Sequence, residues 1–132
     1  MAADGELIVE VLAERLSIVR LEPGNGLPSW IRRSSWLSLT RTHDELSVVC
    51  ESRLVPVGLP RSSPWRALQV VGPLNFELTG ILKRLADPLA AAAISIFAVS
   101  TYDTDYVLVQ EGKLESALMC LKREGIVVRT RR

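Results

Sequence analysis

One sequence pattern occurs twice in this chain, sixty positions apart, and it constrains the fold more than any other feature. Residues 39–51 (LTRTHDELSVVCE) and 99–111 (VSTYDTDYVLVQE) each contain an apolar strand, a short polar turn and a second apolar strand that ends in Glu. Two apolar runs around a turn of this kind predict a β-hairpin. Repetition of a supersecondary unit indicates two copies of one small architecture.

The second half of the sequence predicts a complete α+β unit. The apolar runs predict strands at residues 67–71, 94–99, 106–110 and 126–129. A first helix over residues 78–92 follows from apolar positions at helical spacing, namely Ile81, Leu85, Leu89 and Ala92. The stripe Leu114, Ala117, Leu118 and Leu121 predicts a second helix, which Gly125 ends in the left-handed conformation. The order βαββαβ is ferredoxin-like: a four-stranded antiparallel sheet with both helices on one face.

The first half predicts the same order of elements with shorter helices. A strand at residues 16–21 precedes hairpin strands at 36–40 and 46–50. The first strand and its echo at 67–71 lie about fifty positions apart, ten fewer than the hairpins, so the first copy lacks room for a full helix. The Pro, Gly and Ser residues of segment 56–64 mark the boundary. We therefore predict a degenerate half at 1–64 and a complete half at 65–132.

Composition excludes several classes of function. The 132 residues suffice for one compact domain or two very small halves, and the net charge of +1 carries no signature of nucleic acid or membrane binding. Asp4 and Glu6 precede any apolar run, so we expect no secretory signal. The longest nearly apolar stretch, 88–99, is too short to span a bilayer. We expect a cytoplasmic protein whose two cysteines, Cys50 and Cys120, are buried and reduced.

Catalytic signals are almost absent. The single histidine, His43, lies in a polar turn without an HExxH motif or a cysteine at ligand spacing, and no P-loop motif occurs. The predicted sheet also lacks the aromatic pattern of RNA-binding sheets. We therefore predict no enzyme, no metal, no cofactor and no nucleic-acid partner.

Two polar loops remain, at residues 73–80 and 100–105. The first opens a helix, whose unpaired N–H groups and partial positive charge suit a carboxylate. The second, at the hairpin tip, carries Asp103 and Asp105, which suit an ammonium or a cationic side chain. Together they suit an amino acid. The same residues also fit a structural role, since Asp is common in turns and Thr79 is a good helix cap.

Residues 70–81 (VVGPLNFELTGI) and 94–109 (ISIFAVSTYDTDYVLV) resemble an ACT domain. The resemblance is to the subgroup found in small tandem ACT proteins and in the eukaryotic cytosolic arginine sensors. Residues 36–50 resemble the degenerate first ACT-like half of the same proteins, and the match extends over about residues 15–130.

The resemblance implies a non-catalytic regulatory module. Such a module binds a free amino acid at an interface between two ACT domains, pairs as a homodimer through its sheets, and signals through altered association with a protein partner. Carried over by motif, one wall of the site consists of Leu74, Asn75, Glu77, Leu78, Thr79 and Gly80. The other consists of Thr101, Tyr102 and Asp105, with Asp105 the best candidate for a cationic group of the ligand. The alternative is an ACT-like dimerisation scaffold with no small-molecule ligand.

The sequence departs from the family pattern at two positions. Leu78 stands where the arginine-sensing relatives carry an acid, so a smaller or more apolar amino acid fits equally well. Ala93 replaces the glycine that many ACT domains have just after the first helix, and a left-handed alanine costs roughly 1–2 kcal/mol. In the sixty-residue alignment, Arg41, Thr42 and Glu45 stand opposite Thr101, Tyr102 and Asp105. We therefore expect ligand chemistry at the second tip and structural support at the first.

Overall fold

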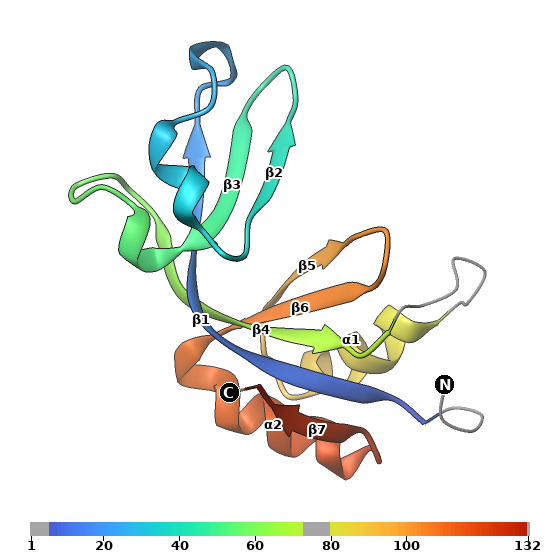
Figure 1. Ribbon diagram of the computed structural model, residues 1–132. Helices are drawn as coiled ribbons and strands as arrows, with labels where there is room; N and C mark the ends of the chain where they lie inside the picture. The colour runs from blue at the N-terminus through green and yellow to red at the C-terminus, as the bar shows by residue number, and fades with distance from the viewer. Residues whose placement is uncertain (1–5, 73–79, 132) are drawn as a thin grey trace. The chain divides into compact units, whose positions relative to one another are not determined.

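The computed structural model describes residues 6–72 and 80–131 (Figure 1). The chain forms two compact units: unit 1 consists of residues 1–13 and 66–132, and unit 2 of residues 14–65. Two strands run from one unit into the other, β1 (Ile8–Leu21) and β4 (Ser62–Val70). The compact units thus differ from the predicted halves, because residues 1–13 group with the second half. The predicted halves 1–64 and 65–132 were defined by the repeated sequence pattern and not by compactness, so this division of the chain stays a prediction.

Unit 1 is an α+β unit in which a sheet carries two helices. Its strands lie in the order β7-β1-β4-β6-β5. Besides β1 and β4, its elements are α1 (Ile81–Ala91), β5 (Ile96–Ser100), β6 (Asp105–Gln110), the short 3-10 helix η4 (Glu111–Lys113), α2 (Leu114–Arg123) and β7 (Val127–Thr130). β5 and β6 form the predicted antiparallel hairpin. The predicted fold class and the order of elements in the second half are confirmed.

One part of the predicted topology is wrong. The sheet of unit 1 is not a four-stranded antiparallel one, because the first part of β1 lies between β4 and β7. β7 pairs with it in parallel, with Ile8 opposite Val127 and Val11 opposite Thr130. The sequence prediction began this strand at Leu16. The alternating run at residues 8–12 indicates a strand, but Glu14 and Arg15 interrupt the apolar pattern where the strand leaves unit 1.

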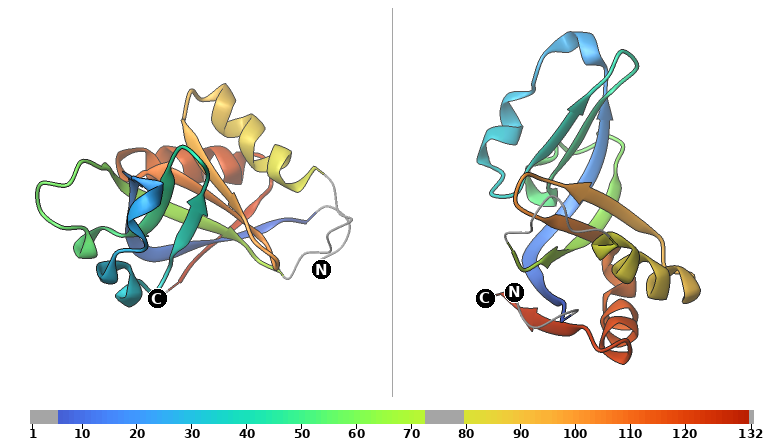
Figure 2. Two further views of the ribbon diagram at one scale, coloured as in Figure 1. Left: turned by 90° about the horizontal axis from the view of Figure 1, so that it is seen from above. Right: turned by 90° about the vertical axis from the view of Figure 1, so that its right-hand side faces the viewer.

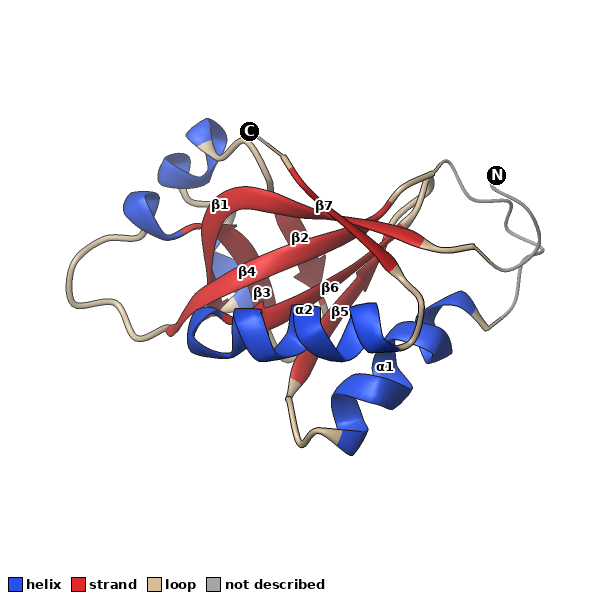
Figure 3. Ribbon diagram, turned by 90° about the horizontal axis from the view of Figure 1, so that it is seen from below, coloured by secondary structure: helices blue, strands red, loops and turns tan. Residues whose placement is uncertain are grey.

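The core of unit 1 lies between the sheet and the helices, which cover one face of it (Figure 3). Alternate residues of the strands point to this face, as the period of a strand requires. The buried side chains from β1, β4 and β6 include Val9, Val11, Leu68, Val70, Val107 and Val109. Leu85 and Leu89 of α1 and Ala117 and Leu121 of α2 meet them, which confirms the helical stripes. Ala92 is exposed, because α1 ends just before it.

Both helices end in the same way. Ala93 follows α1 with φ of 59°, and the Ile94 amide donates to the Leu89 carbonyl at 2.9 Å. Gly125 follows α2 with φ of 82°, and the Ile126 amide donates to the Leu121 carbonyl at 3.1 Å. A left-handed residue followed by such a bond is a common helix ending, which usually uses glycine. The left-handed conformation predicted for Gly125 is confirmed, and Ala93 adopts the same conformation where many ACT domains have glycine.

Unit 2, which is described throughout, contains no α-helix. Its hairpin strands β2 (Ser38–Arg41) and β3 (Leu46–Glu51) pair antiparallel, and β3 pairs antiparallel with the second part of β1. The 3-10 helices are η1 (Pro23–Asn25), η2 (Ser29–Arg33) and η3 (Ser52–Leu54). Ile31 of η2 packs in one buried cluster with Val19 and Val48. The short helix η2 (Figure 2) therefore covers part of the core that a full helix would cover. The prediction of a helix-poor first half is confirmed.

The helices of this protein are short. α1 has 11 residues and α2 has 10. In the described ranges, no helix has the length and apolar character that crossing a membrane requires.

Candidate functional site

The tip of the β5–β6 hairpin is a turn closed by two threonines. The Thr101 amide donates to the Thr104 carbonyl at 2.8 Å, and the Thr101 hydroxyl donates to the same oxygen at 3.1 Å. The Thr104 amide lies 3.3 Å from Thr101 Oγ1 and donates to it. Threonine hydroxyls stabilise turns by such bonds to nearby backbone groups. The tip therefore has a defined conformation that depends on its own side chains.

Thr104 also fixes the tip to the interior of unit 1. Thr104 is only 4% exposed, and its hydroxyl donates to the carbonyl oxygen of Val70, the last residue of β4, at 2.6 Å. A buried hydroxyl needs such a partner, because burying it unpaired is costly. This bond brings the hairpin tip to the place where the chain leaves β4. Sequence reasoning missed Thr104 as a site residue; the available signal was a Thr directly before an apolar strand.

Asp105 lies at the first position of β6, opposite Ser100. The Ser100 hydroxyl donates to Asp105 Oδ1 at 2.6 Å. Because side chains alternate along a strand, Asp105 is on the same face as Val107 and Val109, which contact the helices. A half-buried carboxylate therefore lies at the tip end of an otherwise apolar, helix-facing row.

The other predicted residues of this wall are more exposed. Thr101 is exposed, and its hydroxyl takes part in the turn. Tyr102 is 81% exposed at the apex. The structure thus brings Thr101 and Asp105 together at one tip and places Tyr102 largely in solvent.

Of the opposite predicted wall, Gly80 is within the described residues. It precedes α1 with φ of 78°, a left-handed conformation that only glycine adopts without strain. Its carbonyl accepts the Arg84 amide at 3.0 Å and so begins the helix. The remaining predicted residues, Leu74, Asn75, Glu77, Leu78 and Thr79, lie outside the described residues.

The two hairpins correspond, but with an offset of 59 residues instead of sixty. In unit 2 the Thr42 amide donates to the Glu45 carbonyl at 2.9 Å, so Thr42 is the counterpart of Thr101. The pair at the end of the ladder, Arg41 and Leu46, corresponds to Ser100 and Asp105. The predicted alignment of these tips is therefore wrong by one position. A shift of one residue moves a side chain to the other face of a strand, so the counterpart of Asp105 is the buried Leu46, not Glu45.

An exposed arginine side chain holds the tip of the β2–β3 hairpin in unit 2. Arg20, near the end of β1, donates from Nη2 to the Asp44 carbonyl at 2.6 Å and from Nη1 to Glu22 Oε2 at 2.7 Å. The hydrogen bond with Glu22 raises the pKa of Arg20, so this guanidinium stays charged. The side chains of Arg20 and Glu22 are 58% and 67% exposed, so solvent weakens their attraction. In unit 1 the buried Thr104 hydroxyl connects the tip to the carbonyl of Val70.

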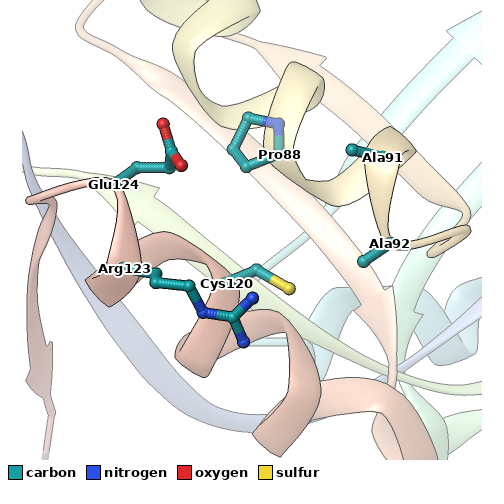
Figure 4. Close-up of a pocket in the computed structure, with 6 residues that line it drawn as sticks. All are labelled: Pro88, Ala91, Ala92, Cys120, Arg123 and Glu124. Carbon is teal, nitrogen blue, oxygen red and sulfur yellow. The ribbon is translucent and has the colours of Figure 1, made fainter.

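Other features do not form a better site. A hollow of about 210 Å³ lies between the last turns of α1 and α2 (Figure 4), lined by Pro88, Ala91, Ala92, Cys120, Arg123 and Glu124. Four of these residues are exposed, so the hollow is open to solvent. Cys120 is half-buried, so the prediction of two buried cysteines is correct only for Cys50. Across residues 6–72 and 80–131, no three His, Cys, Asp or Glu side chains gather as metal ligands would.

Comparison with known proteins agrees with this architecture. The family model described as "ACT domain" matches residues 61–123, and a model described as an N-terminal domain matches residues 14–57. The human protein named cytosolic arginine sensor for mTORC1 subunit 1 is 42% identical over 65 residues, which cover 47% of this chain and 20% of the sensor. The chain thus matches about a fifth of the sensor's length.

Two further proteins match over most of their length. The human putative protein CASTOR3P is 31% identical over 110 residues, covering 73% of this chain and 67% of that protein. A crystal structure of a protein from Agobacterium tumefaciens superposes with a TM-score of 0.90 and 31% identity, over 96% of this chain and 95% of that one. This chain therefore belongs to the ACT-domain family, in the group related to the cytosolic arginine sensors.

Proposed function

We propose that this chain is a regulatory module, without catalytic activity of its own, that binds a free amino acid. The ligand lies at an interface between two ACT domains, and its binding changes the association of the chain with a protein partner in the cytoplasm. The family and the relatives named as arginine sensors support this proposal. The observation that carries it is Asp105, a half-buried carboxylate held by Ser100 at the tip end of an apolar row.

The proposed site has two walls of opposite chemistry. Asp105 binds the ammonium or a cationic side chain of the ligand, because a carboxylate next to an apolar core is stabilised by a charged donor. The start of α1 receives the ligand carboxylate, since the first amides of a helix have no partner within it. The proposed residues are Leu74, Asn75, Glu77, Leu78, Thr79 and Gly80 for the wall that binds the carboxylate, and Thr101, Tyr102 and Asp105 for the wall at the hairpin tip.

A second copy of the chain completes the proposed interface. The ACT-domain model matches residues 61–123 of this chain, and a site between two such domains requires another. We therefore expect a homodimer that pairs through the sheets. A monomer at micromolar concentration in light scattering would contradict this part of the proposal.

The test is thermal unfolding of the full chain with each of the twenty common L-amino acids. A ligand at a hundred times its dissociation constant adds about 2.7 kcal/mol to the free energy of unfolding and so raises Tm. Asp105→Asn, which removes the charge but keeps the shape, should abolish the shift. Asp103→Asn removes an exposed charge from the same tip and should leave the shift intact. If no amino acid raises the Tm of the wild type, the proposal that the chain binds an amino acid is wrong.

The second candidate function is an ACT-like dimerisation scaffold without a ligand. One observation favours it: the Asp105 carboxylate already accepts a hydrogen bond from Ser100, so it has a partner without a bound molecule. The scaffold predicts a dimer that Asp105→Asn leaves unchanged and no effect of any amino acid on Tm.

A further inference from the structure

We propose that Thr104 is a positioning residue of the proposed ligand site. Through its buried hydroxyl it holds the turn that carries Thr101 and Asp105 at the end of β4. The role in ligand binding rests on the proposed function, whereas the coupling between the tip and β4 can be tested without a ligand.

The position of Thr104 in the hydrogen-bond network supports this role. Its carbonyl accepts both the amide and the hydroxyl of Thr101, at 2.8 and 3.1 Å, so it determines the orientation of Thr101. Its hydroxyl donates to the Val70 carbonyl at 2.6 Å. One residue therefore connects the turn to the neighbouring strand, and Asp105 follows it directly in the chain.

The receiving strand is itself fixed at this point. The amide of Val71, the residue after β4, donates to the Ile8 carbonyl of β1 at 2.9 Å. The end of β4 thus has β1 on one side and the tip, through Thr104, on the other. A shift of the tip relative to β4 would break the Thr104 bond and leave a buried carbonyl without that donor.

A buried position of this size does not require a hydroxyl for reasons of volume, because valine is β-branched and has nearly the shape of threonine. What threonine adds is a single directional bond. In unit 2 the counterpart of Thr104 is Glu45, which is half-buried, and that tip is held by the exposed Arg20. The buried bond thus occurs at the tip that carries Asp105, directly before it in the chain.

The first test measures amide hydrogen exchange by NMR in the wild type, Thr104→Val and Thr104→Ser, all as the full chain. Thr104→Val removes only the donor, so we expect about tenfold faster exchange at both Thr101 and Val71. Thr104→Ser keeps the hydroxyl donor, so both exchange rates should stay within about twofold of the wild type. The Ile126 amide, bonded to Leu121 after α2, is the distant control and should not change. Unchanged exchange at Val71 in Thr104→Val, or equal acceleration at Ile126, overturns the proposal.

The second test separates the positioning role from the proposed function. With an amino acid that raises the wild-type Tm as the probe, titration calorimetry should give at least about tenfold weaker binding for Thr104→Val and near wild-type binding for Thr104→Ser. Equal affinity of Thr104→Val and wild type would overturn the positioning role and leave the proposed function in place. If no amino acid binds the wild type, the proposed function fails, and amide exchange alone decides whether Thr104 couples the tip to β4.

Discussion

Ser100 and Asp105 face each other at the end of the β5–β6 ladder, and the Ser100 hydroxyl lies 2.6 Å from Asp105 Oδ1. The corresponding pair in unit 2 is Arg41 and Leu46, in which Leu46 is buried in the core of that unit. The same hairpin position thus holds an apolar side chain in one unit and a carboxylate in the other. The carboxylate contributes little to a strand, since Asp is among the residues that strands disfavour.

Asp105→Leu, which introduces the residue of the unit 2 hairpin, should therefore stabilise the chain and remove its ligand response. We expect the free energy of unfolding to rise by about 0.5–1 kcal/mol, because leucine suits a half-buried strand position better than aspartate. Urea unfolding gives the stability, and thermal shift with amino acids gives the response. Ser47→Leu, at a half-buried position of β3, is the control for adding an apolar side chain elsewhere. A destabilised Asp105→Leu variant would show that the carboxylate has a structural role.

Ala93→Gly should also stabilise the chain, for a reason confined to the backbone. Ala93 has φ of 59°, which costs alanine roughly 1–2 kcal/mol, whereas glycine loses about 0.4–1 kcal/mol more entropy on folding. The net gain in the free energy of unfolding is about 0.5–1 kcal/mol. Gly125→Ala, at the matching end of α2, should cause a loss of about the same size. Urea unfolding of both variants checks the pair, and a loss in Ala93→Gly would contradict the strain argument.

The sequence was sufficient for the elements whose signal is local. The helical stripes, which include Leu85 with Leu89 and Ala117 with Leu121, correctly predicted which sides of α1 and α2 face the core. Gly125 was enough to predict a left-handed residue at the end of α2. In both cases, residues within one or two turns determine the conformation.

Features that depend on distant residues were harder to predict. Insertion of β1 between β4 and β7 joins residues more than one hundred positions apart, and no local pattern encodes this pairing. The hairpin offset of 59 was missed because both strands contain apolar residues on each face, so alternation did not fix the register. The bond from Thr104 to Val70 likewise depends on two strands that the sequence places 34 positions apart. At the candidate site, the sequence motif nominates Asp105, but it does not reveal the bonds from Ser100 to Asp105 and from Thr104 to Val70.

Arg61 should be more important to the stability of unit 2 than its exposed position suggests. Its guanidinium donates to the carbonyls of Leu59, Val55 and Pro56 at 3.0, 3.4 and 2.5 Å, which closes the loop between η3 and β4. Arg61→Ala should lower the free energy of unfolding by about 1 kcal/mol and speed amide exchange at Leu59. Arg61→Lys should recover only part of this, because an ammonium lacks the planar fork that reaches several carbonyls. Full recovery in Arg61→Lys would mean that charge alone matters.

Glu51 should make the stability of unit 2 depend on pH in the acid range. The backbone amide of Ser35 donates to Glu51 Oε2 at 2.7 Å, and Arg53 Nε donates to Oε1 at 3.2 Å. The Ser35 amide is the main reason that the pKa of Glu51 lies below its usual value of 4.5. A carboxyl whose pKa is lower in the folded state adds stability above its unfolded pKa, and this stability is lost as pH falls through the folded pKa.

Glu51→Gln should therefore be less stable than the wild type at pH 7, by about 1–2 kcal/mol, because the side chain is only 14% exposed and its bonds are charge-assisted. The difference should shrink as pH falls below about 4.5. Glu14 shares the Ser35 hydroxyl, which lies 2.9 Å from Glu14 Oε2, so Glu14→Gln is the matched control. Urea unfolding between pH 3 and pH 7 measures both variants. A difference between wild type and Glu51→Gln that stays constant over this range would show that the charge on Glu51 does not contribute to holding the segment around Ser35.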